Sequence, residues 1–270
     1  MKTIVTTAYL PNDKTDRLAE QVSKDLSILF VRRNKRSIER IHAEEQCDVL
    51  VAAKERLEFY PMGETEPFFF HPNSSAFRTK RPLAQDPLIE VSGLAEGDVF
   101  IDCTLGMASD AIVASQMVGA DGAVFGCETH PVIAYIVQCG LQDYIGMPHL
   151  TEAMQRIQVI SQDAVDFLAT LAEDSADVIY MDPMFTEEIT EASNFTPLRS
   201  AAATDQLTQL WIDEAKRVAR KAVVLKAHFR SQDFEKFGFV RRVRPNTKFH
   251  YGVIDCGKNK RFFVLPLPLR

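Results

Sequence analysis

The chain has 270 residues, of which 46% are hydrophobic and 25% are charged, with a formal net charge of −6. This composition is ordinary for a globular protein, and no apolar run approaches the roughly 18 residues that suggest a membrane span. Five scattered cysteines without a C-x-x-C pair argue against a disulfide framework and a zinc site, and the N-terminus is too short in apolar length for a signal peptide. We therefore expect a cytoplasmic protein that binds neither membrane nor metal.

Charge is distributed unevenly along the chain. Residues 1–84 carry 14 Lys and Arg against 12 Asp and Glu, residues 85–190 carry 1 against 18, and residues 191–270 carry 16 against 7. An acidic middle suits a cationic ligand, and a basic end suits a polyanion. The alternative is that charges gather by chance on solvated faces, and asymmetry alone favours that alternative. The overall acidity argues against non-specific nucleic-acid binding.

Residues 1–84 predict a small α/β domain and a linker, with a possible role in substrate recognition. Residues 56–60 and 67–71 resemble a hairpin, and the polar residues 72–85 are expected to link two domains. The other expected elements are strands at Thr3–Ala8, Ser27–Val31 and Asp48–Ala52 and helices at Lys14–Leu26 and Ser37–Gln46.

Residues 85–270 alternate regularly between apolar strands and helical patterns. This alternation, followed by a terminal pair at Tyr251–Cys256 and Arg261–Leu265, predicts a mostly parallel sheet with an antiparallel terminal hairpin. The expected strands are Val99–Cys103, Ala123–Cys127, Ile157–Ile160, Asp177–Met181 and Ala222–Lys226; the expected helices are Pro87–Gly93, Asp110–Val118, Pro131–Leu141, Ala164–Leu171 and Asp205–Ala219.

Four carboxylates stand at or just past the ends of four successive strands: Asp102, Glu128, Asp163 and Asp182. Ligands of open α/β sheets bind beyond the carboxyl ends of the strands, so the four should converge on one ligand. Glu128 follows Asp102 by 26 residues, close to the spacing at which an acidic residue meets a ribose hydroxyl. The alternative, that each residue only caps the next helix, explains one such residue better than four in register.

The turn after the first of these strands argues against a dinucleotide. Residues 104–109 contain only Gly106 rather than G-x-G-x-x-G, and Asp110 in the first helical turn would repel a phosphate. A nucleoside ligand without pyrophosphate is favoured, and S-adenosylmethionine (SAM) fits because its cationic groups suit an acidic surround.

Residues 85–270 resemble the class I SAM-dependent methyltransferases, and more narrowly the family of the bacterial small-subunit ribosomal RNA guanine-N2 methyltransferase J. The family motif D-A-T-A-G-L-G-R-D-A is matched by D-C-T-L-G-M-A-S-D-A at Asp102–Ala111, and E-x-x-P-V begins at Glu128. D-P-M-F-P is matched at Asp182–Phe185, with Thr186 in place of the final proline. Ala108 and Ser109 also depart from the family, which has glycine and arginine there.

The resemblance implies a Rossmann-like fold, SAM as cofactor and an RNA base amine as substrate. Asp182 and the Pro183 carbonyl would bind the amine, and Phe185 would stack on the flipped base. The expected cofactor-binding residues are Asp102, Thr104, Gly106, Ser109, Asp110, Glu128 and Asp163, with Thr104, Gly106 and Ser109 at the methionine end, Glu128 at the ribose and Asp163 at the adenine.

Basic residues supply the expected contacts to RNA, which the resemblance identifies as ribosomal. Lys226 could orient the substrate or a phosphate, although a snorkelling lysine at a strand end is an equally good interpretation. Arg78, Arg81 and Arg261 are the other expected substrate-binding residues. A small-molecule or protein methyltransferase, or a non-catalytic module that binds SAM or RNA, are the alternative functions. The sequence leaves the oligomeric state open.

Overall fold

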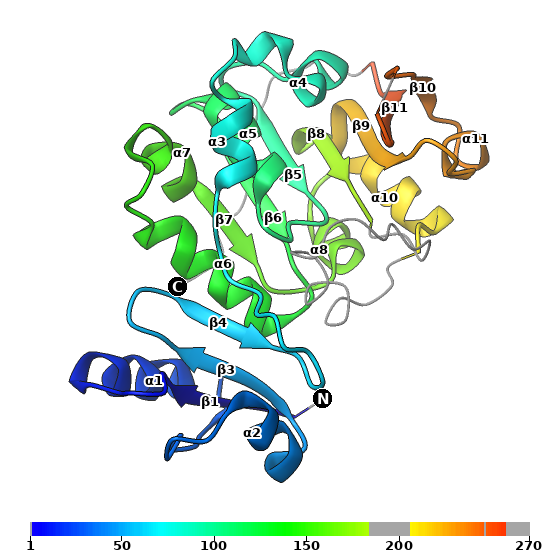
Figure 1. The fold of residues 1–270 in the computed structure, drawn as a ribbon. Helices are drawn as coiled ribbons and strands as arrows, with labels where there is room; N and C mark the ends of the chain where they lie inside the picture. The colour runs from blue at the N-terminus through cyan, green and yellow to red at the C-terminus, as the bar shows by residue number, and fades with distance from the viewer. Residues whose placement is uncertain (1, 184–205, 246, 258–270) are drawn as a thin grey trace.

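The structure, a computed structural model, describes residues 2–183, 206–245 and 247–257. It contains a seven-stranded sheet with strand order β10-β11-β9-β8-β5-β6-β7 and a four-stranded sheet with order β2-β1-β3-β4 (Figure 1). The predicted α/β class is confirmed.

Five neighbouring strands of the larger sheet are parallel, and one strand beside them runs the other way. β11 pairs antiparallel with both β9 and β10, so β10 again runs in the direction of β9. The mostly parallel sheet is confirmed, but the neighbour of β11 at the edge is β10, which the sequence did not predict; residues 261–265 lie outside the described residues. The strands are β5 (Val99–Asp102), β6 (Ala123–Cys127), β7 (Ile157–Ile160), β8 (Ala176–Met181), β9 (Ala219–His228), β10 (Val240–Arg242) and β11 (Phe249–Asp255).

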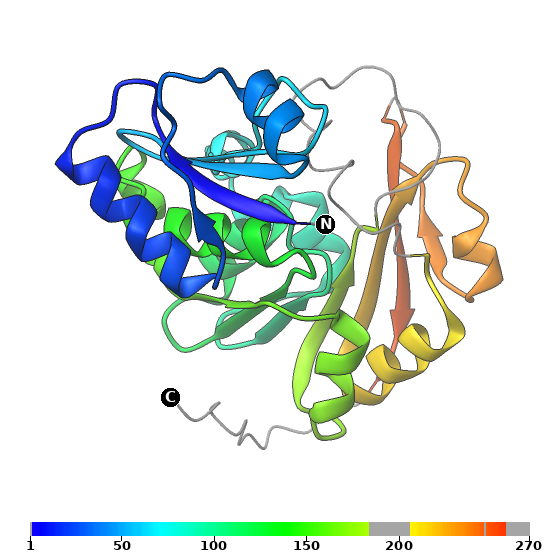
Figure 2. The ribbon, with the colours of Figure 1, turned by 90° about the horizontal axis from the view of Figure 1, so that it is seen from below.

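Helices cover both faces of this sheet, which explains why its central strands are mostly apolar. All six residues of β8 are buried. The face of α10 formed by Trp211, Ile212, Ala215 and Val218 packs with α8 on one face, whereas α4, α5 and α6 cover the other (Figure 2). The helices are α4 (Pro87–Ser92), α5 (Ser109–Val118), α6 (Pro131–Asp143), α7 (Thr151–Gln155), α8 (Ala164–Thr170), α10 (Gln209–Val218) and α11 (Asp233–Lys236).

The N-terminal residues form the smaller sheet. β1 is parallel to β2 and β3, whereas β4 is antiparallel to β3. A bridge between Phe59 and Phe68 matches the expected hairpin. The elements are β1 (Thr3–Thr7), α1 (Asp13–Asp25), β2 (Leu29–Phe30), α2 (Ile38–Glu45), β3 (Asp48–Ala52) and β4 (Leu57–Tyr60).

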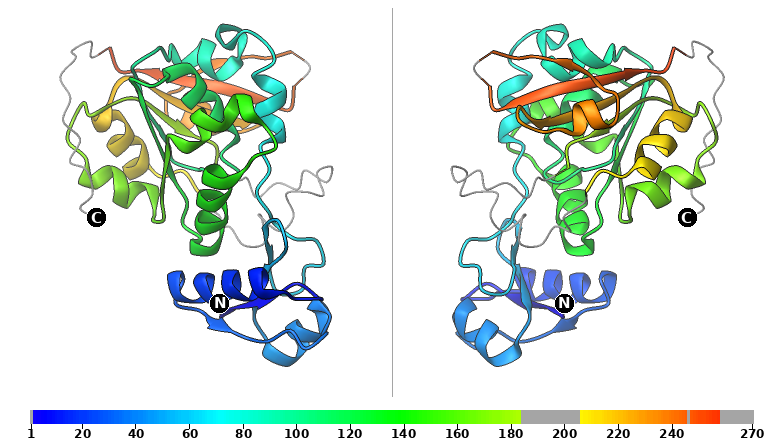
Figure 3. Two further views of the ribbon diagram at one scale, coloured as in Figure 1. Left: turned by 90° about the vertical axis from the view of Figure 1, so that its left-hand side faces the viewer. Right: turned by 90° about the vertical axis from the view of Figure 1, so that its right-hand side faces the viewer.

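The smaller sheet packs against α6 (Figure 3). Phe59 belongs to the same apolar cluster as Ile133 and Ile136 of α6. Gly140 of α6 admits the ring of Phe70, since a Cβ atom there would lie 2.2 Å from that ring. Because α6 starts after the carboxyl end of β6, the N-terminal unit stands beside the edge at which the parallel strands end.

Residues 72–85, expected as a polar linker, contain the helix α3 (Asn73–Arg78) and the short 3-10 helix η1 (Leu83–Gln85). The hydroxyl of Ser75 is buried and donates to the carbonyl of Ser109 at 3.0 Å, which ties α3 to the start of α5. The polar side chains of residues 72–85 suggested a solvated linker, but Ser75, Arg78 and Thr79 have hydrogen-bond partners within the protein. Within the described part of the chain, no helix is long and apolar enough to cross a membrane.

Candidate active site

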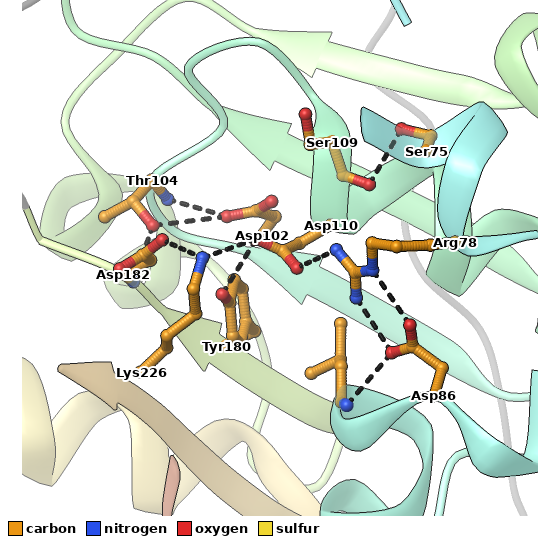
Figure 4. Close-up of polar contacts among 11 residues, drawn as sticks. Ser75, Arg78, Asp86, Asp102, Thr104, Ser109, Asp110, Tyr180, Asp182 and Lys226 are labelled. Carbon is orange, nitrogen blue, oxygen red and sulfur yellow. Dashed lines mark hydrogen bonds and ion pairs between the residues drawn. The ribbon is translucent and has the colours of Figure 1, made fainter. Parts of the chain in front are cut away.

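The parallel strands bring the predicted carboxylates to one edge of the sheet. Asp102 ends β5, and Glu128, Asp163 and Asp182 follow β6, β7 and β8. Since these four strands are parallel, all four residues lie at their carboxyl ends. Thr104 bonds both Asp102 and Asp182, and ion pairs lead from Asp182 through Lys226 of β9 to residues of α5 and α3 (Figure 4).

Lys226 lies between the carboxylates of Asp182 and Asp110. Met181 of β8 is in register with Leu225 of β9, so the residues that follow them are also neighbours. The Lys226 Nζ atom is 2.5 Å from Oδ2 of Asp182 and 3.3 Å from Oδ2 of Asp110. Burial alone would lower the pKa of Lys226, but the two carboxylates outweigh it and hold the pKa above its ordinary value. Lys226 is therefore a counter-ion rather than a solvated strand-end lysine.

Asp110, in the first turn of α5, is bound from three sides. It accepts from Arg78 Nη1 at 2.6 Å and from the Tyr180 hydroxyl at 2.9 Å, in addition to its contact with Lys226. Burial would raise the pKa of Asp110, but Lys226 and Arg78 lower it below the ordinary range. Asp110 is thus ionised and fully partnered by protein groups.

Arg78 extends this network to the start of α4. Its Nε and Nη2 atoms each donate to the Asp86 carboxylate at 2.8 Å. Asp86 in turn accepts from the backbone N–H of Leu88 and caps α4. A chain of alternating charges therefore runs from Asp182 through Lys226, Asp110 and Arg78 to Asp86.

Thr104 connects the turn after β5 to the residues after β8. Its backbone N–H donates to Asp102 Oδ1 at 3.0 Å, and its hydroxyl accepts from the N–H of Asp182 at 2.7 Å. Asp102 is 1% exposed. Burial, with repulsion from Asp110, raises the pKa of Asp102 to about 8. Asp102 therefore holds a proton more readily than an ordinary aspartate does.

The turn itself adopts a left-handed backbone at two positions, with φ of +47° at Gly106 and +58° at Ala108. A left-handed backbone strains the alanine at position 108, which accounts for the glycine that the family has at that position. Leu105 packs on Gly126 of β6, where a Cβ atom would lie 2.3 Å from the leucine. Ala108 makes no side-chain cap for α5. Backbone N–H groups at the start of α5 therefore face the carboxyl ends of the strands without a capping side chain.

The remaining predicted residues are placed as follows. Oε1 of Glu128 accepts from the N–H of His130 at 2.9 Å. Oδ1 of Asp163 accepts from two N–H groups of α8, so this residue caps the helix, as the alternative interpretation held. Arg81 is exposed, with its guanidinium 5.8 Å from the centre of the Phe77 ring. Phe185 and Arg261 lie outside the described residues.

Sequence reasoning missed Tyr180 and Asp86 and did not connect Arg78 with Asp110. One signal was available in the charge partition. Residues 85–190 contain a single basic residue, Arg156, so buried carboxylates of that segment require cations from the flanking segments. No group of three or more His, Cys, Asp or Glu suited to a metal ion occurs among the described residues.

The comparisons with known proteins agree on a class. The family described as "Putative SAM-dependent methyltransferase" matches residues 35–241. The chain is 43% identical to the "Uncharacterized protein YpiP" of Bacillus subtilis (strain 168) over 93% of this chain and 99% of that protein. It is 30% identical to the ribosomal RNA small subunit methyltransferase J of Nitrosococcus oceani over 66% of this chain and 72% of that protein. The structure of a SAM-dependent methyltransferase from Neisseria gonorrhoeae matches with a TM-score of 0.63 at 15% identity, over 93% of this chain and 95% of that one.

The fold is that of a class I methyltransferase. The chain belongs to the SAM-dependent methyltransferase family and resembles its small-subunit ribosomal RNA methyltransferase J members. It is an enzyme, its cofactor is SAM, and its larger sheet is the Rossmann-like sheet of these enzymes. The described residues fit this cofactor: carboxylates at the strand ends suit its cationic and hydroxyl groups, and the start of α5 offers N–H groups to a carboxylate.

The ion pairs of Arg78 lead to a prediction about stability. We expect Arg78→Met to lower the free energy of unfolding by about 3 kcal/mol or more, because buried Asp86 loses its cation and buried Asp110 keeps only Lys226. Arg81→Met, three residues further along the chain and exposed, should change it by less than about 0.5 kcal/mol. Urea unfolding of both variants measures the difference. Equal losses in the two variants would show that the ion pairs of Arg78 contribute nothing to the free energy of unfolding beyond what an exposed arginine contributes.

Asp102 leads to a prediction about pH. Its pKa is about 8 in the folded protein and near the ordinary aspartate value when unfolded, so the folded state binds an extra proton between these values. The free energy of unfolding that Asp102 contributes is therefore full at acidic pH and is lost as the pH rises toward about 8. Asp102→Asn removes this component, so the variant should gain stability relative to wild type from about pH 5 to about pH 8. Parallel stability curves, measured by urea unfolding across that range, would contradict the assignment.

Proposed function

We propose that this methyltransferase N-methylates an exocyclic base amine, guanine N2, in small-subunit ribosomal RNA. The observation that carries the proposal is the position of Asp182 and Pro183 directly after β8, with Asp182 paired to Lys226 at 2.5 Å. A base amine is a poor nucleophile because its lone pair is conjugated with the ring. The Asp182 carboxylate and the Pro183 carbonyl are two acceptors in consecutive residues, which suits the two N–H bonds of one amine and favours a pyramidal nitrogen.

SAM supplies a methyl group bonded to a positively charged sulfur. The amine nitrogen forms a bond to the methyl carbon as the carbon–sulfur bond breaks, and the electron pair of that bond remains on sulfur. The nitrogen then loses a proton, which Asp182 accepts and passes to water. Burial raises the pKa of Asp182, which strengthens its carboxylate as an acceptor, and Lys226 opposes the shift and favours the ionised form.

Roles follow for the other residues at this edge. Thr104, Gly106 and Ser109 remain proposed for the methionine end of the cofactor, Glu128 for the ribose and Asp163 for the adenine. Asp110 is enclosed by protein partners, so we assign it to the positioning of Lys226 rather than to direct cofactor contact. Arg78 likewise positions Asp110, whereas the exposed Arg81 remains a proposed RNA contact.

The relatives support an RNA substrate. Proteins of Nitrosococcus oceani and Thioalkalivibrio sulfidiphilus that are similar to this chain are named ribosomal RNA small subunit methyltransferase J. The chemistry argued for Asp182 and Pro183 supports a base amine as the acceptor, and the resemblance of the D-P-M-F motif supports guanine. We further propose that the N-terminal unit, which packs on α6 beside the same edge, helps to recognise the substrate.

The direct test is transfer of radiolabelled methyl from SAM to small ribosomal subunits isolated from a strain that lacks this protein. Subunits from the parent strain and free nucleosides run in parallel. Label only in the subunits of the deletion strain is the expected result, and digestion of the RNA then identifies the base. Label on a protein or a metabolite, with none on RNA, would overturn the RNA assignment.

Asp182→Asn tests the proposed role of the carboxylate in the same assay. A carboxamide cannot take the proton, so we expect the rate of methyl transfer to fall by about 10²-fold or more. Binding of SAM, measured by calorimetry, should persist. Asp121→Asn is the matched control, since Asp121 is exposed and precedes β6 at the opposite end of the strands. A wild-type rate in Asp182→Asn would refute the role.

A further inference from the structure

Three aromatic rings gather at the end of β9, in a group that we name the aromatic platform: His228, Phe229 and Phe249. Phe249 of β11 is in register with His228. The ring centres of His228 and Phe229 are 4.5 Å apart, and those of His228 and Phe249 are 6.4 Å apart. Phe229 is 38% exposed, so the platform is not an ordinary part of the core.

The aromatic platform adjoins the candidate active site. The Lys226 Nζ atom lies 5.7 Å from the centre of the Phe249 ring and 2.5 Å from Asp182 Oδ2. The ring centre is therefore within about 8 Å of the carboxylate proposed to bind the amine. The base of a nucleotide adjacent to one bound at Asp182 could therefore contact the platform.

Two arginines lie beside the platform. The Nη1 atom of Arg241 donates to the carbonyl of Phe229 at 2.9 Å. Asp233 accepts from Ser231, and Glu235 forms an ion pair with Arg241 at 2.9 Å. The guanidinium of Arg230, which is exposed, lies 5.2 Å from the centre of the Phe229 ring. An exposed ring with an exposed arginine beside it suits a ligand with flat faces and a polyanionic backbone.

We propose that His228, Phe229 and Phe249 form a stacking site for an unpaired nucleobase next to the nucleotide that is methylated, with Arg230 beside its phosphate. This inference rests on the proposed function, RNA amine methylation, and adds that the RNA around the target is single-stranded where it binds. Bases within a duplex stack on each other and cannot present a face to the platform. A protein substrate would need acidic residues to match the same surface, which makes it the less suitable ligand.

The test uses the full chain and a fluorescein-labelled, single-stranded RNA of about 12 purine nucleotides. Phe229→Leu keeps apolar volume but removes the aromatic face, so we expect its affinity for this RNA, measured by anisotropy, to fall about 5-fold to 100-fold. Phe229→Trp should bind at least as tightly as wild type. Ile145→Ala is the control, since Ile145 is 89% exposed and follows α6 at the far end of the strands.

A second measurement checks that the effect is specific to stacking. A duplex of the same sequence should bind wild type and Phe229→Leu equally, and thermal unfolding and SAM binding should be the same in both proteins. Equal affinity of wild type and Phe229→Leu for the single strand, with methyl transfer to RNA intact, would overturn this inference alone. A wild-type protein that neither binds nor methylates RNA would overturn the proposed function and this inference together.

Discussion

A partly buried cation between two carboxylates is the interaction on which the site depends. Lys226 contacts Asp110 and Asp182 at the edge where β8 and β9 end, and Arg78 supports Asp110 from the other side. Asp102, two strand positions from Lys226, shows the consequence of lacking such a contact. Burial raises its pKa to about 8, whereas the pKa of Asp110 lies below its ordinary range. Lys226 and Arg78 thus keep Asp110 ionised in a setting that otherwise favours neutral carboxyl groups.

In the folded protein, carboxylates of the acidic middle segment pair with cations of the two flanking segments. Among the described residues, each ion pair formed by a carboxylate of residues 85–190 uses a cation from outside that segment. The pairs are Asp86 and Asp110 with Arg78, Asp177 with Arg220, Asp98 and Asp177 with Lys221, and Asp110 and Asp182 with Lys226. Chance placement on solvated faces, which asymmetry alone favoured, does not describe these pairs. They hold the early helix α3 and the late strand β9 to the acidic centre of the molecule.

The sequence predicted what local patterns determine. Strands buried on both faces produce apolar runs, so β6 and β7 were placed to the residue, and the polar residues after the runs had to lie at the sheet edge. Partners distant in sequence were beyond such patterns: nothing near Lys226 indicates Asp110, and nothing near Arg78 distinguishes a buried arginine from a solvated one. β10, with three residues, is too short for a period to show. Asp163 caps α8 through Oδ1, and its contact with the adenine stays a prediction.

The central claim, that Lys226 and Asp110 stabilise each other across the edge, is tested most directly by a double-mutant cycle. The free energy of unfolding is measured by urea for wild type, Lys226→Met, Asp110→Asn and the double variant. We expect Lys226→Met alone to cost about 3 kcal/mol or more, and the double variant to lose less than the sum of the single variants by about 1–3 kcal/mol. Additive losses would mean that the two charges do not interact, which would contradict the role of Lys226 as the shared counter-ion.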